Sequence, residues 1–87
     1  MAQLIPVYGD VEEIKYDGSE MSLDQMQKLV GGYIEIIYLE NQMMIINEEG
    51  KFTQQKNEWA TRLASKFMFA GDYIAGPAIL LEQGEIS

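Results

Sequence analysis

The residue types best suited to ligand binding lie in one short segment, where Trp59, Arg62 and Lys66 follow one another at intervals of three and four residues. In a helix, which turns by about 100° per residue, these side chains fall within an arc of roughly 60°. An aromatic plane beside two cations can stack on a flat ring while the cations pair with phosphate or carboxylate. The spacing therefore predicts a binding face for a small anionic ligand of nucleotide type. A structural interpretation stays open, in which Trp59 covers the core and both cations extend into water.

Catalytic chemistry has little support in the sequence. The chain contains neither histidine nor cysteine, so the most frequent general base, the commonest metal ligand and all thiol chemistry are missing. Glycine-rich phosphate loops and nucleophile-elbow motifs are also absent. Carboxylates remain at Asp10, Glu12 and Glu13 and at Glu48 and Glu49, but their spacing does not match a calcium-binding loop. We therefore expect a protein that is not an enzyme and that has no metal and no cofactor.

Acidic residues are distributed unevenly along the chain. The net charge is −8; residues 1–50 hold ten acidic and two basic side chains, whereas residues 51–87 hold four of each. Duplex DNA and anionic membranes both select basic surfaces, so we expect direct contact with neither. The simplest explanation for the acidic excess is solubility.

Length and composition favour one domain in the cytoplasm. A chain of 87 residues has too little interior for two cores, so residues 1–87 are expected to form a single compact domain. Hydrophobic residues make up 47% of the sequence, which is typical of folded proteins. No apolar run approaches the roughly 18 residues of a membrane helix, and the first residues do not have the pattern of a signal peptide. Together with the lack of cysteine, these features predict a cytoplasmic protein.

The first third of the chain is expected to contain a hairpin and a capped helix. Residues 3–8 and 11–16 have apolar members suited to two short paired strands. Ser22 stands three residues before Gln25, which is the spacing of a capping box at a helix start. Apolar residues then recur on one face until Gly31 and Gly32, one of which is expected to end the helix in the left-handed conformation.

The centre of the chain predicts a second hairpin with an unusual property. Residues 33–39 and 42–46 are rich in β-branched and aromatic side chains, and the Glu40-Asn41 step between them suits a tight reversal. The first of these strands is apolar on both faces, and such strands are normally covered on both. The following turn is expected to end at Gly50 with a positive φ.

The second half of the chain is expected to hold one longer helix and the last strands. The helix is predicted over about residues 55–69, and its core stripe comprises Ala60, Leu63, Ala64 and Phe67. Residues 73–75 predict a short strand and residues 78–81 a buried one.

These elements predict an α+β fold with a small mixed or antiparallel sheet of about four to five strands packed against two helices. One helix layer covers one face of a sheet, so the other face needs a second layer or a second subunit. We expect a homo-oligomer, because a small chain gains a ligand cavity most easily at a subunit boundary. Tyr33 or Tyr38 could there join Trp59, Arg62 and Lys66 from either chain.

One part of the sequence is similar to a known family. The run LVGGYIEIIYLENQMMIINEEGK, preceded by the capped helix and followed by GDYIAGPAILL, resembles short phage and Firmicute proteins classed only as a domain of unknown function. The resemblance spans about residues 4–82. It departs in FTQQKNEWATRLASKF, where the family has an asparagine-rich turn and this chain has only Asn57. The resemblance implies a non-enzymatic protein encoded on a mobile element, and it transfers no catalytic residue.

Two functional hypotheses follow from these features. In the first, a phage or mobile-element protein sequesters a nucleotide-type immune signal in the host cytoplasm and so counters host defence; its negative charge would repel an anion unless the basic residues are focused locally. In the alternative, an acidic inhibitor of the anti-CRISPR or anti-restriction type uses acids of residues 10–24 and 35–49 to bind a basic nucleic-acid-binding surface of a host defence protein. A closed aromatic pocket would favour sequestration, and a contiguous acidic face would favour the inhibitor. A structural accessory module would show neither feature.

Overall fold

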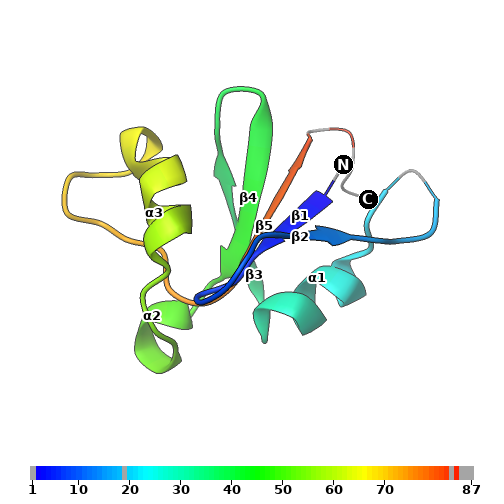
Figure 1. The fold of residues 1–87 in the computed structure, drawn as a ribbon, viewed down its shortest axis with the longest axis horizontal. Coiled ribbons are helices and arrows are strands. Elements are labelled where there is room, and N and C mark those ends of the chain that lie inside the picture. The colour runs from blue at the N-terminus through cyan, green and yellow to red at the C-terminus, as the bar shows by residue number, and fades with distance from the viewer. Residues whose placement is uncertain (1, 19, 83, 85–87) are drawn as a thin grey trace.

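The computed structural model describes residues 2–18, 20–82 and 84. One antiparallel sheet has the strand order β2-β1-β5-β4-β3, and helices lie on both sides of it (Figure 1). The strands are β1 (Ala2–Ile5), β2 (Glu12–Ile14), β3 (Ile34–Tyr38), β4 (Gln42–Asn47) and β5 (Ala78–Glu82). The helices are α1 (Leu23–Val30), α2 (Gly50–Thr53), α3 (Glu58–Ala64) and the short 3-10 helix η1 (Ser65–Phe67). The predicted small α+β fold is thereby confirmed.

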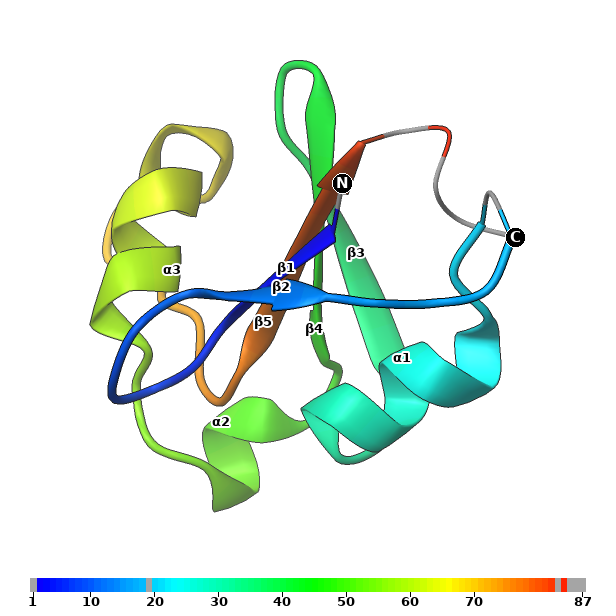
Figure 2. The ribbon, with the colours of Figure 1, turned by 45° about the vertical axis from the view of Figure 1, so that its right-hand side comes forward.

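Hydrophobic side chains fill the space on both faces of the sheet. On one face Ile45 of β4 lies in a cluster with Met26 and Val30 of α1. On the other face Met44 of β4 lies in a cluster with Ala60 of α3. Figures 1 and 2 show α1 and α3 on opposite sides of the sheet. The expectation that the helices form one layer was therefore wrong, and the central strands need no second subunit to cover them.

The two predicted hairpins are both present. Ala2 pairs with Ile14 at the first, and Tyr38 pairs with Met43 at the second. The last strand, β5, lies between β1 and β4 at the centre of the sheet, where Ile79 is fully buried. Strand β5, the last strand of the chain, thus lies between the two hairpins. Strands β2 and β3 form the two edges of the sheet.

The first helix begins and ends where the sequence predicts. The Ser22 hydroxyl oxygen accepts a hydrogen bond of 3.2 Å from the Gln25 backbone N–H, and Gly31 ends the helix with φ +87°. The Gln25 side-chain amide also donates to the Lys15 carbonyl oxygen at 3.1 Å. This bond ties α1 to the segment that follows β2.

The second helix is shorter than the predicted span of residues 55–69. Helix α3 begins after Asn57, whose side-chain oxygen accepts from the Ala60 N–H at 3.0 Å, and it tightens into η1 from Ser65. Asn57 determines where α3 begins, because asparagine is a favourable N-cap residue. Gln55, the predicted start of the helix, would not supply such a cap. Leu63 and Phe67, expected in the core stripe, are 36% and 38% exposed. None of the helices in the described ranges is long and apolar enough to cross a membrane.

Gly50 has a different role from the predicted one. It opens α2 and is not among the glycines with positive φ. A Cβ atom at this position would lie 2.7 Å from the carbonyl oxygen of Ala75, so the close approach of two backbones requires glycine. The strand expected over residues 73–75 is reduced to a single bridge between Ala75 and Lys56.

Candidate functional site

Asn57 fixes the position of α3, the helix that holds the predicted binding residues. Its side chain is fully buried, and its amide nitrogen donates to the carbonyl oxygens of Ile5 and Gly76, each at 2.9 Å. A second contact holds the same segment, because the Ile74 N–H donates to the Thr61 hydroxyl at 2.9 Å. The face of α3 that reaches solvent is therefore set by hydrogen bonds to β1 and to the segment before β5.

The structure brings Trp59 and Arg62 together on α3, whereas Lys66 lies beside a different ring. The guanidinium carbon of Arg62 lies 5.6 Å from the centroid of the Trp59 ring, which is itself 47% exposed. Lys66 lies beyond α3 in η1, and its Nζ is 5.5 Å from the Phe67 ring. Trp59 and Arg62 thus form an exposed pair on α3, and Lys66 lies beside the ring of Phe67.

The two tyrosines of the predicted site lie at opposite ends of β3. Tyr33 is 71% exposed and lines a shallow depression with Gly31, Gly32 and Asn47. Tyr38 is 63% exposed at the other end of the strand. In the part of the chain that the structure describes, neither tyrosine lines the two larger grooves beside η1.

An open groove of about 460 Å³ lies beside η1 on the face of the sheet that α3 covers. We call it the Tyr73 groove. Its lining includes Glu35, Ile37, Lys51, Lys66, Phe67 and Tyr73. These residues come from β3, α2, η1 and the segment before β5, which lie far apart in the sequence. The groove thus combines cations, carboxylates and rings that no local motif brings together.

Tyr73 is the centre of the cationic side of this groove. The Nζ of Lys51 lies 4.9 Å from the Tyr73 ring centroid, and the Nζ of Lys56 lies 5.9 Å from it. Lys51 also forms an ion pair with Asp72, whose carboxylate accepts a further hydrogen bond of 2.8 Å from the Tyr73 N–H. Two ammonium groups therefore lie close to this ring.

The ion pair changes the protonation behaviour of both partners. The hydrogen bond from Lys51 lowers the pKa of Asp72 below its usual value, and the backbone N–H of Tyr73 acts in the same direction. The same bond raises the pKa of Lys51. Both groups are solvent-accessible and stay charged at neutral pH.

A second open groove, of about 520 Å³, lies on the other side of η1. We call it the hairpin groove, since residues at the β3–β4 turn line it together with Leu63, Lys66 and Phe67. Its cation is Lys66, which it shares with the Tyr73 groove, and Glu40 and Glu82 face it. The Tyr73 groove has one more cation and is the better candidate for an anionic ligand.

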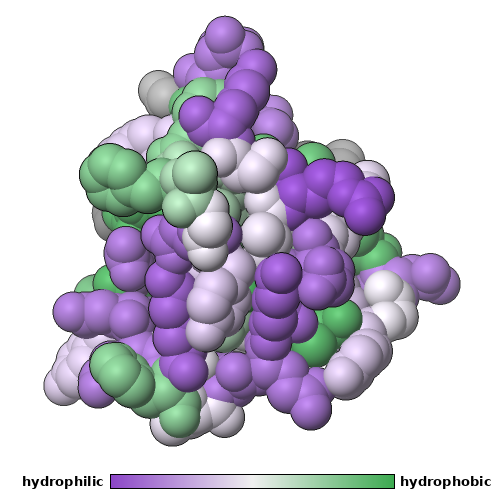
Figure 3. Space-filling model, turned by 90° about the vertical axis from the view of Figure 1, so that its left-hand side faces the viewer, coloured by the Kyte–Doolittle hydropathy of each residue, from purple (hydrophilic) through white to green (hydrophobic). Residues whose placement is uncertain are grey.

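Cations of the second half of the chain are all paired with rings. The distances from the charged group to the ring centroid are between 4.9 and 5.9 Å for Lys51, Lys56, Arg62 and Lys66. Seen from the end that holds α2 and α3, apolar side chains reach the surface as separate patches among hydrophilic ones (Figure 3). The sequence prediction missed Lys51 and Tyr73, although the equal number of acids and bases in residues 51–87 is a signal for this region.

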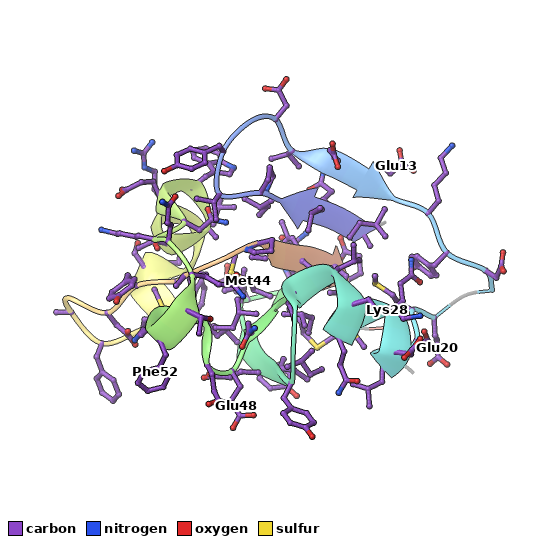
Figure 4. The ribbon with its side chains drawn as sticks, turned by 90° about the horizontal axis from the view of Figure 1, so that it is seen from below. Glu13, Glu20, Lys28, Met44, Glu48 and Phe52 are labelled. Atoms are coloured by element: carbon purple, nitrogen blue, oxygen red, sulfur yellow. The ribbon has the colours of Figure 1, made fainter. Side chains whose placement is uncertain are left out.

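Acidic side chains occur on more than one side of the molecule. Figure 4 shows Glu13, Glu20 and Glu48 pointing outward on separate sides of the molecule. In the described residues, no three histidine, cysteine, aspartate or glutamate side chains come close enough to share a metal ion. These three acids of the first half therefore do not share one face.

Fold and groove together define a small α+β domain with an open, mixed polar and aromatic groove beside its second long helix. The chain belongs to the family described as a domain of unknown function, DUF3846, whose profile matches residues 4–86. The resemblance inferred from the central hairpin is confirmed to that extent. Comparisons with curated proteins and with solved structures gave no match.

Proposed function

We propose that the chain is a non-catalytic binding protein that sequesters a small anionic ligand bearing a flat ring in the Tyr73 groove. The observation that carries the proposal is the placement of Lys51 and Lys66 on one groove with the Tyr73 and Phe67 rings. Cations beside exposed rings are the arrangement that binds a stacked base and its phosphate. The groove volume also lies in the range common for ligand sites.

Each side chain of the groove has a defined role in this proposal. Lys51 and Lys66 bind the phosphate, and the ring of the ligand stacks on Tyr73 or Phe67. The carboxylate of Glu35 accepts hydrogen bonds from a donor on the ring, such as an exocyclic amino group. Because the groove carries carboxylates as well as lysines, it selects an anion that also donates hydrogen bonds, which a nucleotide does.

The proposed biological role is capture without turnover. Resemblance to phage and Firmicute proteins suggests a setting in which a nucleotide-type immune signal is removed from the host. Local focusing of cations at one end of the molecule makes anion binding compatible with a net charge of −8.

The test is calorimetric titration of the full chain with mononucleotides and cyclic dinucleotides. The parts of a nucleotide, inorganic phosphate and adenosine, serve as separate probes. We expect at least one nucleotide to bind more tightly than either part, and Lys66→Ala to weaken that binding by about tenfold or more. Lys28→Ala is the matched control, since Lys28 is an exposed lysine on the opposite side of the sheet. Equal binding by both variants would overturn the assignment of the groove.

A second candidate function rests on the acids near β2. Asp10, Glu12, Glu13 and Asp17 are all exposed, and they flank or lie on an edge strand. We infer that this edge would be the contact surface if the chain were an acidic inhibitor of a basic host protein. The groove residues would then be dispensable, which separates the two candidates experimentally.

A further inference from the structure

Strand β3 has a free edge whose hydrogen-bonding groups can be assigned. The Leu39 N–H donates to the Gln42 carbonyl at 2.9 Å, and the Glu48 N–H donates to the Tyr33 carbonyl at 2.8 Å. In an antiparallel pair every second residue bonds to the neighbouring strand. Residues 33, 35, 37 and 39 therefore bond to β4, and Ile34, Ile36 and Tyr38 direct their backbone N–H and C=O groups outward. No strand lies beyond β3 in the part of the chain that the structure describes.

The two edges of the sheet differ in how well they resist association. Edge strand β2 is three residues long, and two of them are Glu12 and Glu13. Edge strand β3 is five residues long, and Glu35 is its one charged residue. Short, charged edges block pairing with other chains, whereas longer apolar edges invite it. The β3 edge is therefore the open side of the sheet.

We propose that β3 pairs antiparallel with β3 of a second copy of the chain, with Ile36 on the twofold axis. In this register Ile36 faces Ile36 of the second copy, and Tyr38 faces Ile34. All three outward-directed residues then exchange both backbone hydrogen bonds with the other strand. The pairing is self-complementary, so the two copies form a closed dimer with one continuous sheet.

Side chains and charge both favour a second copy as the occupant of this edge. Tyr38 opposite Ile34 is an aromatic and β-branched pair, a combination that stabilises antiparallel strands. Pairing through β2 would instead bring Glu12 and Glu13 of two copies together. Pairing through β3 leaves these acids at the two far edges of the joined sheet, where repulsion between the copies is weakest.

The dimer would also extend the Tyr73 groove, a consequence that rests on the proposed function. Glu35 and Ile37 line the groove from β3. In the proposed register Glu35 faces Ile37 of the second copy, and directly opposed residues lie on the same face of the sheet. The second copy thus adds the same two side chains to the open side of the groove.

Sedimentation equilibrium of the full chain without ligand tests the interface, over protein concentrations from about 10 µM to about 1 mM. We expect a mass approaching twice 9.9 kDa at the upper end. Ile36→Pro removes an outward N–H and no bond to β4, so it should raise the dimer dissociation constant by about 25-fold or more. Ile36→Ala, the matched control, loses the same side chain but keeps the N–H, and it should have a much smaller effect.

A wild-type chain that stays monomeric throughout would overturn the proposal, and so would a proline variant that dimerises as well as the alanine variant. If Ile36→Pro does not fold, Tyr38→Lys gives the answer, because this exposed side chain faces Ile34 of the second copy. Tyr8→Lys is its control at an exposed tyrosine away from β3. We expect only Tyr38→Lys to dissociate the dimer; an unaffected dimer would contradict the interface. Sedimentation without ligand tests the dimer, and nucleotide titration tests the proposed function. Failure of one proposal is therefore distinguishable from failure of the other.

Discussion

The side-chain amide of Asn57 donates a hydrogen bond of 2.9 Å to the carbonyl oxygen of Ile5, 52 residues earlier in the chain. The same nitrogen donates to Gly76, and the side-chain oxygen caps α3. One buried residue therefore joins the first strand, the second long helix and the segment that leads into the last strand. Together with the bond between Thr61 and Ile74, it fixes α3 against the sheet.

Asn57→Ala should lower the free energy of unfolding by about 3 kcal/mol, because it removes a helix cap and leaves two buried carbonyl oxygens without this donor. Ser22→Ala is the matched control: it removes the cap of α1 at an exposed site and should cost about 1 kcal/mol. Urea unfolding of both variants measures the difference. Equal losses would contradict the tertiary role of Asn57.

The variant Gly50→Ala tests whether helix propensity or packing decides the stability of the protein at this position. Propensity alone predicts that alanine stabilises α2 by about 1 kcal/mol. The new Cβ would lie 2.7 Å from the Ala75 carbonyl oxygen, so we expect a net destabilisation of about 1–2 kcal/mol. Thr53→Ala, at an exposed position of the same helix, should change stability by less than about 0.5 kcal/mol. A stabilised Gly50→Ala variant would show that the two backbones can move apart.

The Lys51–Asp72 pair should make a pH-dependent contribution to stability. Since the pKa of Asp72 is lowered from 3.8, its contribution is complete above that value and is lost as the pH falls through the lowered pKa. Since the pKa of Lys51 is raised from 10.5, its contribution is present below that value and is lost as the pH rises through the raised pKa. Asp72→Asn should therefore lower the unfolding temperature at neutral pH and have no effect in strong acid.

Thermal unfolding of the wild type and Asp72→Asn between about pH 2 and pH 9 checks this expectation. The difference should also shrink at high salt, because both side chains are exposed to solvent. A difference in unfolding temperature that grows as the pH falls would contradict this expectation. The asparagine side chain keeps an oxygen for the Tyr73 N–H, so the variant isolates the charge.

Two pairs of variants decide between the binding face predicted from the sequence and the groove found in the fold. If the exposed stack of Trp59 and Arg62 is the site, Trp59→Ala with Arg62→Ala abolishes nucleotide binding while the fold is retained. We expect that pair to weaken binding by less than about threefold, and Lys51→Ala with Lys66→Ala to weaken it by about 100-fold. Calorimetry measures both, and circular dichroism confirms folding. If the Trp59 and Arg62 variant loses binding and the Lys51 and Lys66 variant keeps it, the ligand site is the exposed surface of α3.

Charge reversal at Glu12, Glu13 and Asp17 distinguishes sequestration from acidic inhibition. These side chains are exposed and lie outside the residues that line the Tyr73 groove, so nucleotide affinity should stay within about twofold of the wild type. An acidic inhibitor would instead lose activity, and its binding would depend steeply on salt. Activity that disappears after charge reversal, with nucleotide binding unchanged, would favour the inhibitor.

The sequence by itself determined the elements whose signals are local. Ser22 and Gly31 mark the ends of α1 because a cap and a left-handed glycine act within one turn of the helix. The run of β-branched and aromatic residues around Glu40 and Asn41 specifies a hairpin for the same reason, since the paired residues are close in sequence. The family and the α+β class follow from these local patterns.

Only the tertiary structure decided how those elements are layered and where the groove lies. Helix α3 lies on the face opposite α1, and there Asn57 bonds to β1, a contact between residues that no local pattern relates. Lys51 and Tyr73 also meet only in the folded chain, since α3 and η1 lie between them in the sequence. Long-range placement is chosen by competition among all ways of burying the apolar surface, so periodicity and spacing predict each element but not which face it covers.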